Sequence, residues 1–425
     1  MKIKTARVSY LQIINRKKEK PFVSKRPNLF FRTLLKLVSL PDLIATKFTY
    51  IKVGMERLGK KEPCLYLMNH SSFLDLEMAV SMVYPRPVNI VSTLDGLVGK
   101  RWLMRQIGCI PTRKFVFDVG LVRELFRVAQ KENTSVLMFP EAGYTFDGTA
   151  IPLPEHLATF VKKLGLPVVM LRTFGAFSRD PLYNNLQRRK VKASAEMRYI
   201  LSPEDLKTMS DDEVRGILDE QFTFDHFRWQ YENKIKIDEP FRADGLHRVL
   251  YKCPHCKAEG KTEGKGIHLK CHACGKTYKL TEYGALCATE GDTAFSFVSD
   301  WCAWEEEEVK REIAEGAYSL DISVEIGMIV NTKKMYFVGD GRLTHTAEEG
   351  LHLTGCDGQL DYTQKPLATY DLNVDYNFYE IGDVISLGDM QALYYCFPKD
   401  SSTPVTKARF AAREIYRLHR DKSKK

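Results

Sequence analysis

His70 and Asp75, five positions apart, are the residues of this chain best suited to acid–base chemistry. An imidazole takes up a proton near neutral pH, and a carboxylate that accepts from one ring nitrogen leaves the other nitrogen free. On one ideal helix, however, side chains five residues apart point about 140° away from each other. The two can therefore meet only if His70 lies at or before a helix start, with Asn69 or Ser71 as the cap. The spacing predicts a strand-to-helix turn in which His70 is a general base and Asp75 orients it.

Single His-x4-Asp pairs are common by chance, so the surrounding segments decide the interpretation. They are, in order, the apolar run 64–68 before the pair, a second run at 88–93, the turn GCIPTRK at 108–114, a third run at 135–139 that leads into PEAGYT at 140–145, and a fourth run that begins at 166. Over residues 30–220 this order and spacing resemble the four motifs of the glycerophospholipid acyltransferases. That family includes lysophosphatidate (1-acylglycerol-3-phosphate) acyltransferase.

The resemblance implies a reaction and a set of site residues. In the family, the histidine deprotonates the acceptor hydroxyl, which attacks an acyl thioester, so His70 would be the base and Asp75 its orienter. The resemblance implies substrate contacts from Arg113, Glu141, Gly143 and Tyr144. Arg113 stands where the family has an arginine for the acceptor's phosphate. Glu141 has an equally strong alternative as a structural carboxylate that caps or pairs within its turn.

The third motif departs from the family's usual Phe-Pro-Glu-Gly-Thr-Arg-Ser. The chain has Phe-Pro-Glu-Ala-Gly-Tyr-Thr at 139–145, so Tyr144 replaces an arginine that normally contacts phosphate. Arginine offers a charged two-pronged donor, whereas tyrosine offers one hydroxyl. The departure leaves catalysis intact and puts the acceptor's head group in question.

A second chemical signal is a pair of C-x2-C motifs, Cys253/Cys256 and Cys271/Cys274, separated by 14 residues. Four thiolates at this spacing predict a zinc ribbon, with two disulfides or unrelated thiols as alternatives. His255 or His272 could replace a cysteine, although both are expected to face solvent. A full tetrahedral shell makes the zinc structural, and no catalytic metal is expected. The other six cysteines show no pairing pattern, which fits buried free thiols in a reducing compartment.

Positive charge is concentrated at the two ends of the chain. The net charge is +9, of which residues 1–62 carry +12 and residues 403–425 carry +6, so the middle carries −9. Between residues 29 and 40, apolar residues accompany Arg32 and Lys36, which sit four apart on the expected polar side. This pattern predicts an amphipathic helix on an anionic membrane surface, and a basic helix packed on the domain is the alternative.

No apolar run reaches the ~18 residues of a membrane span, and no signal-peptide cleavage site follows the basic start. We therefore expect a cytoplasmic protein that is peripheral on the cytosolic face of a membrane.

Composition divides the chain into five segments. These are a basic amphipathic membrane-association segment (1–52), the acyltransferase catalytic domain (53–240), the zinc ribbon (241–290), a linker helix (291–316) and a β-rich domain with a C-terminal basic helix (317–425). In the second segment, apolar runs alternate with helical patterns, which is typical of α/β layers on a largely parallel sheet. In the last segment, short alternating runs with turn signals every 8 to 12 residues predict strands that resemble a pleckstrin-homology or GRAM-like barrel.

Two classes of function compete. One is an O-acyltransferase that moves a fatty acyl group from acyl-coenzyme A or acyl-carrier protein to a lysophospholipid hydroxyl. Its first expected acceptor is 1-acyl-sn-glycerol-3-phosphate, which would give phosphatidic acid, and another lysolipid head group is the alternative. The other class is a non-enzymatic zinc-ribbon protein that grips nucleic acid with its basic ends. Acids such as Asp238 and Glu239 flank the ribbon, and no aromatic residues alternate with its cations. The four ordered motifs have no explanation under the second interpretation, so no nucleic-acid partner is expected.

Overall fold

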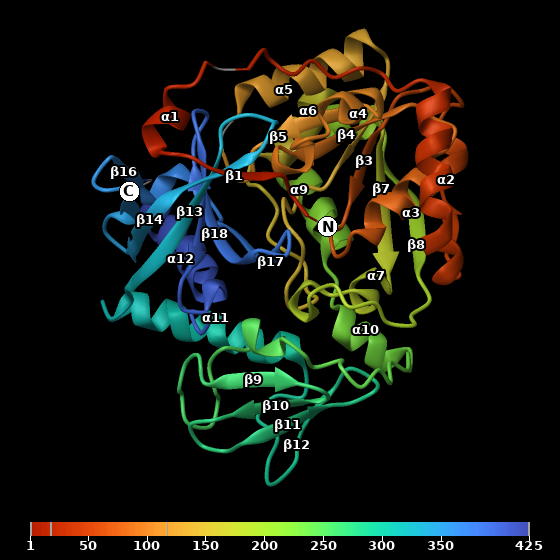
Figure 1. The fold of residues 1–425 in the computed structure, drawn as a ribbon. Helices are drawn as coiled ribbons and strands as arrows, with labels where there is room; N and C mark the ends of the chain where they lie inside the picture. Colours follow the sequence, from red (N-terminus) through yellow and green to blue (C-terminus); the bar gives the residue numbers. More distant parts are fainter. Residues whose placement is uncertain (1, 18, 117, 424–425) are drawn as a thin grey trace.

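The computed structural model describes residues 2–17, 19–116 and 118–423, and its strands there form three sheets (Figure 1). The first sheet runs in the order β2 (Thr49–Val53), β8 (Ser194–Leu201), β7 (Val168–Phe174), β3 (Leu65–Met68), β6 (Ser135–Met138), β4 (Val88–Thr93) and β5 (Cys109–Thr112). Neighbouring strands are parallel except β7 and β8. The prediction of α/β layers on a largely parallel sheet is therefore confirmed.

Helices cover both faces of this sheet, which explains why its strands are continuous apolar runs. The helices on one face are α2 (Leu29–Ala45) and α3 (Leu74–Val83), and those on the other are α5 (Val119–Phe126), α6 (Leu157–Leu164) and α9 (Asp211–Phe222). Along β3 the side chains alternate between the two cores. Tyr66 and Met68 pack with Met78 of α3, and Leu65 and Leu67 pack on the opposite face.

Two helix starts have N-cap residues of the types that favour helix initiation. The Asp118 carboxylate accepts from the Leu121 amide at 3.1 Å and caps α5. Ser202 caps α8 (Pro203–Thr208), which has proline as its first residue. These local signals place the loops that follow β5 and β8.

The second sheet is the ribbon, with strands β12 (Leu286–Ala288), β11 (Thr277–Leu280), β10 (His268–Cys271) and β9 (Thr262–Lys265). Figure 1 shows α11 (Val298–Ala314) lying between this ribbon and the C-terminal sheet. Trp301 of α11 is fully buried and meets Tyr278 of the ribbon, with ring centroids 4.9 Å apart. The ribbon therefore shares its core with α11 and does not stand alone.

The third sheet is antiparallel along the order β16 (Leu360–Gln364), β15 (Gly350–Gly355), β14 (Met335–Thr346), β13 (Leu320–Ile329), β19 (Leu393–Pro398), β18 (Gly382–Gly388) and β17 (Asn373–Phe378). The C-terminal helix α12 (Val405–Ser423) packs on β17 and β18. The β-rich region with its closing helix is thus confirmed. Among the described residues, β16 and β17 end the hydrogen-bonded order without pairing with each other, so the sheet is open rather than the closed barrel that the strand pattern resembled.

The first 52 residues contribute to two parts of the molecule. Strand β1 (Thr5–Arg7) pairs in parallel with β14 of the C-terminal sheet, whereas α2 packs against α3 on the first sheet. The orientation of α2 differs from the expectation. Arg32 donates to the Pro85 carbonyl and the Lys36 ammonium lies 4.3 Å from the Tyr84 ring centroid, so both cations face the domain. Leucine, valine and phenylalanine side chains occupy the outer face instead.

Candidate active site

Three of the four sequence motifs meet at one edge of the first sheet. Strands β3, β6, β4 and β5 are parallel, so their carboxyl ends lie at the same edge. His70 follows β3 by two residues, Glu141 follows β6 by three, and Arg113 follows β5 directly. The carboxyl edge of a parallel sheet is where α/β proteins place their ligands.

The predicted turn brings His70 and Asp75 together. Strand β3 ends at Met68 and α3 begins at Leu74, so His70 lies before the helix as the spacing required. Its Nδ1 is 3.2 Å from Oδ2 of Asp75. The Asp75 side chain is fully buried, whereas that of His70 is 20% exposed. Within the described residues Nε2 of His70 has no hydrogen-bond partner, so this nitrogen is available to a substrate.

Asp75 is held by more groups than its sequence neighbours suggest. Its carboxylate accepts from the Ser71 amide at 2.6 Å, from the Ser72 amide at 2.9 Å and from the Thr173 hydroxyl at 3.2 Å. Neither expected cap residue caps α3 in the expected way. The N-cap is Phe73, the Leu74 amide donates to the Ser72 hydroxyl, and Asn69 accepts from the Thr173 amide on β7.

The environment of His70 favours its neutral form. Burial lowers the pKa of His70 below its ordinary value, and the hydrogen bond to Asp75 acts in the opposite direction. Lys114, in the turn after β5, is the nearby cation that lowers this pKa further. A neutral imidazole with Nδ1 held by a carboxylate is the form that accepts a proton at Nε2.

Glu141 fixes the backbone of the same turn. One carboxylate oxygen accepts from the His70 amide at 2.7 Å, and the other accepts from the Ile151 amide at 2.8 Å. Burial raises the pKa of Glu141 to about 8, although these two amides favour its charged form. The contacts of Glu141 are those of a carboxylate that pairs within its turn. A direct contact between Glu141 and substrate stays a prediction.

Two aromatic rings cover His70. The centroids of Phe139 and Tyr144 lie 4.2 Å and 4.1 Å from that of the imidazole. Tyr144 is thus directed at the base itself, and burial raises the pKa of its hydroxyl well above the ordinary value. Its predicted contact with the head group would have to be made from this position.

The remaining predicted substrate contacts lie beside the C-terminal sheet. Nη1 of Arg113 is 3.8 Å from Oδ2 of Asp118 and 3.8 Å from the Met390 sulfur. A Cβ added at Gly143 would lie 3.9 Å from Nη2 of Arg409, on α12. The second and third motifs are therefore in contact with a part of the chain that lies far away in sequence.

Sequence reasoning missed three contributors to this site. Thr173 comes from β7, 98 residues after Asp75. Asp180 accepts from the Ser72 hydroxyl and pairs with Arg179 at 2.6 Å. Arg409 comes from the last helix. No local pattern marks any of the three, because each reaches the site through the packing of the whole fold.

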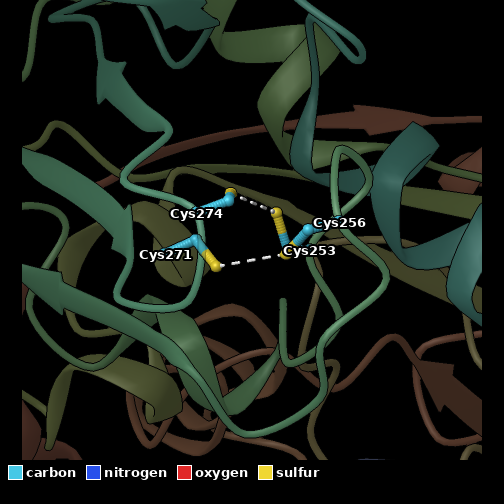
Figure 2. A group of neighbouring side chains, drawn as sticks. All are labelled: Cys253, Cys256, Cys271 and Cys274. Carbon is cyan, nitrogen blue, oxygen red and sulfur yellow. Dashed lines mark hydrogen bonds between the residues drawn. The ribbon is translucent and has the colours of Figure 1, made fainter.

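The four predicted metal ligands form a separate cluster in the ribbon (Figure 2). The Sγ atoms of Cys253 and Cys274 are 3.8 Å apart, and those of Cys256 and Cys271 are 3.7 Å apart. Four sulfurs bound tetrahedrally at about 2.3 Å from zinc would be separated by about 3.8 Å. Two of the sulfur pairs thus have the separation expected in a tetrahedral zinc site, and all four sulfurs lie within 4.8 Å of one another.

The other cysteines and the two ribbon histidines largely follow expectation. Five of the six remaining cysteines are buried, and Cys287 is exposed. His255 and His272 are exposed, and His272 pairs with Glu263 at 2.8 Å.

Comparisons with known proteins find similarity in the part of the chain that forms the first sheet. The sequence model of a family described as Acyltransferase matches residues 50–172. A chloroplastic 1-acyl-sn-glycerol-3-phosphate acyltransferase of Brassica napus is 27% identical over 125 residues, which are 29% of this chain and 36% of the relative. The chain thus spans about a third of the length of that relative. The crystal structure of the 1-acyl-sn-glycerophosphate acyltransferase PlsC from Thermotoga maritima aligns with 45% of this chain and 78% of its own, at 16% identity and a TM-score of 0.36.

Proposed function

We propose that the protein moves a fatty acyl group from a thioester to the free hydroxyl of a lysophospholipid. The match of residues 50–172 to the acyltransferase family model supports this proposal. The first acceptor to test is 1-acyl-sn-glycerol-3-phosphate, whose product is phosphatidic acid. The donor is acyl-coenzyme A or acyl-carrier protein. The observation that carries the proposal is the buried pair of His70 and Asp75 at the carboxyl end of β3.

The geometry supports the following course of reaction. Nε2 of His70 takes the proton of the acceptor hydroxyl while Nδ1 stays engaged by Asp75. The acceptor oxygen attacks the thioester carbonyl, an ester bond forms and the carbon–sulfur bond breaks. The leaving thiolate takes the proton from His70, which returns the imidazole to its neutral form. In this course Asp75 stabilises the transient imidazolium, as the acidic member of a catalytic triad does.

The proposal is tested with purified protein, a lysophospholipid and an acyl thioester. We expect release of free thiol in equal amount to the diacyl product. Thiol release without an acylated lipid would indicate a thioesterase, and neither product with any lysophospholipid would contradict the proposal.

Arg113 is proposed to act on acceptor affinity rather than on the chemical step. We expect Arg113→Ala to raise KM for a phosphate-bearing acceptor by about tenfold with kcat nearly unchanged, because a charged hydrogen bond to phosphate contributes about 1.5 kcal/mol or more. Arg113→Lys keeps the charge but loses the planar fork, so an intermediate KM is expected. Arg123→Ala, on α5, is the matched control. Unchanged kinetics in Arg113→Ala would place the head-group site elsewhere.

Acylation of another lysolipid is favoured by one observation, the packing of Tyr144 against His70. Tyr144 occupies the position of the family's phosphate-binding arginine, and its ring packs on the His70 ring instead. Acceptors other than lysophosphatidate are therefore expected to be used, and a panel of head groups with one acyl chain measures this.

We propose that the four-cysteine cluster holds one structural zinc ion. The donor set and the sulfur spacing support zinc, since thiolates are its preferred ligands in structural sites. Four thiolates complete a tetrahedral shell, so the ion would contribute folding energy rather than reaction chemistry.

We propose that α2 docks the protein on the cytosolic face of a membrane. Its exposed apolar side chains include Phe30 and Val38, each 67% exposed, and Trp102 beside them is 68% exposed. Trp102 lies on α4 (Arg101–Gln106), and its ring centroid is 5.9 Å from that of Phe31, so the apolar face of α2 extends to α4. None of the helices in the described ranges combines the length and the apolar character of a membrane span. The apolar surface would instead lie within the interface.

We expect the double variant Phe30→Asp/Val38→Asp to bind vesicles at least about tenfold more weakly, because each lost side chain forfeits about 1.5 kcal/mol or more of burial. Flotation with vesicles of mixed anionic and zwitterionic phospholipid measures the binding. Leu367→Asp, at a 49% exposed residue of the C-terminal domain, is the control. Equal binding by both variants would show that α2 is not the docking surface.

A further inference from the structure

One arginine of the last helix touches the loop of the third motif. The guanidinium carbon of Arg409 lies 5.0 Å from the Phe146 ring centroid. A Cβ added at Gly143 would lie 3.9 Å from Nη2 of the same side chain. Arg409 is only 4% exposed, so it forms part of the wall behind this loop and is not a surface cation.

The position of Arg409 is fixed by a buried cluster of charges. Its Nη2 and Nε donate to the Asp371 carboxylate at 2.8 Å and 3.1 Å, and Nη2 of Arg413 donates to the same carboxylate at 3.0 Å. Two guanidinium groups on one carboxylate leave a surplus positive charge next to the loop. Because Arg409 is engaged by Asp371 and shielded from solvent, it is not placed to bind a substrate phosphate.

The loop in turn holds the backbone of the base from both sides. Glu141, which precedes Gly143, accepts from the His70 amide at 2.7 Å. The Thr145 amide, which follows Gly143, donates to the His70 carbonyl at 3.0 Å. Phe146 also packs against Tyr376 of β17, with ring centroids 4.4 Å apart. A movement of this loop would therefore move His70 relative to Asp75.

We propose that Arg409 is a positioning residue for the catalytic base, through which α12 fixes the third-motif loop that holds the His70 backbone. It acts on the loop and on the Glu141 carboxylate, not on the substrate. The inference rests on the proposed acyl transfer. It makes the C-terminal sheet and α12 part of the catalytic unit, although the matched family segment ends at residue 172.

The test compares three variants of the full-length protein. We expect Arg409→Ala to lower kcat by about tenfold to a hundredfold with little change in KM for either substrate, because a small displacement of a catalytic group costs rate rather than affinity. Arg409→Lys keeps the charge and should recover part of the loss. Arg417→Ala is the matched control, since Arg417 lies two turns further along α12, is 51% exposed and pairs with Glu414. Its kinetics should equal those of the unmodified protein.

The pH profile separates positioning from general loosening. Glu141 accepts from both amides most strongly when it is ionised. Burial and the Asp75 charge raise its pKa, whereas Arg409 lowers it. Activity should therefore rise with pH towards about 8 as Glu141 ionises. Loss of Arg409 should shift this rise to higher pH, and Arg417→Ala should leave it in place.

A further variant keeps the proposal testable if Arg409→Ala fails to fold. Phe146→Leu removes the aromatic face under the guanidinium but leaves the ion pair with Asp371, and it too should lower kcat at constant KM. Wild-type kcat and pH profile in folded Arg409→Ala, or wild-type kcat in Phe146→Leu, would overturn the assignment. An inactive unmodified protein would instead contradict acyl transfer itself, so the two failures are distinguishable.

Discussion

The variant His70→Ala is expected to lose acyl transfer by at least about a hundredfold while its fold and melting temperature stay close to those of the unmodified protein. A positioned general base contributes typically 10²–10⁴-fold to a rate, and no other imidazole among the described residues contacts Asp75. The side chain is partly exposed and makes one hydrogen bond, so its removal leaves a small gap beside the Phe139 and Tyr144 rings rather than a collapsed core. Turnover is measured as thiol release together with diacyl product.

His156→Ala is the matched control for this experiment, because His156 is exposed and its side chain caps nothing at the start of α6. Asp75→Asn should lower kcat by about a hundredfold, since an amide orients the ring poorly and no longer stabilises its charged form. The asparagine oxygen can still accept from the Ser71 and Ser72 amides, which favours an intact fold. Full activity in His70→Ala would remove the base from the proposed reaction.

Removal of one ribbon thiolate should abolish metal binding and unfold the ribbon. We expect one zinc per unmodified chain by elemental analysis and none in Cys271→Ser, because a structural site loses most of its affinity with one of four ligands. The residues near 250–290 should then become sensitive to protease. Since Tyr278 of the ribbon packs on Trp301, tryptophan fluorescence should report the same loss.

The ribbon carries its own control in Cys287, which is exposed on β12 and outside the cluster. Cys287→Ser should keep zinc, protease resistance and activity. In Cys271→Ser, activity should fall only as far as the shared core with α11 is loosened. A metal-free protein that stays folded, lacks activity and regains it specifically with zinc would make the ion catalytic.

The sequence was most informative where the determining contacts are local. The turn that carries His70 lies between one apolar strand and one helix start. The residues that determine both elements lie close to His70 in the sequence. The four-cysteine cluster likewise follows from the spacing of two short motifs. The partners that complete the site could not be predicted in this way. Thr173 reaches Asp75 only after β7 has joined β3, and Arg409 reaches Phe146 only after α12 has packed beside the first sheet.

The orientation of α2 shows a second limit of sequence reasoning. Helical periodicity groups Arg32 and Lys36 on one side, but it does not say which side meets the domain. The carbonyl of Pro85 and the ring of Tyr84 attract both cations inward, and this leaves the apolar residues outside. The membrane interpretation of this segment therefore stands on its exposed apolar face rather than on its charge.

The pairing of β1 with β14 constrains the order in which the chain can fold. The hydrogen bond from Arg16 to Tyr336, next to this pairing, closes a loop of 320 residues. Closing so long a loop costs about 5 kcal/mol of chain entropy unless the intervening residues are already compact. β1 should therefore dock late, after the first sheet and the C-terminal sheet have each formed. During synthesis on the ribosome, β1 stays unpaired until its partner strand β14 has been made, hundreds of residues later. Arg409 is made after β14. Under the proposal for Arg409, a nascent chain forms the first sheet long before it contains the arginine that positions His70.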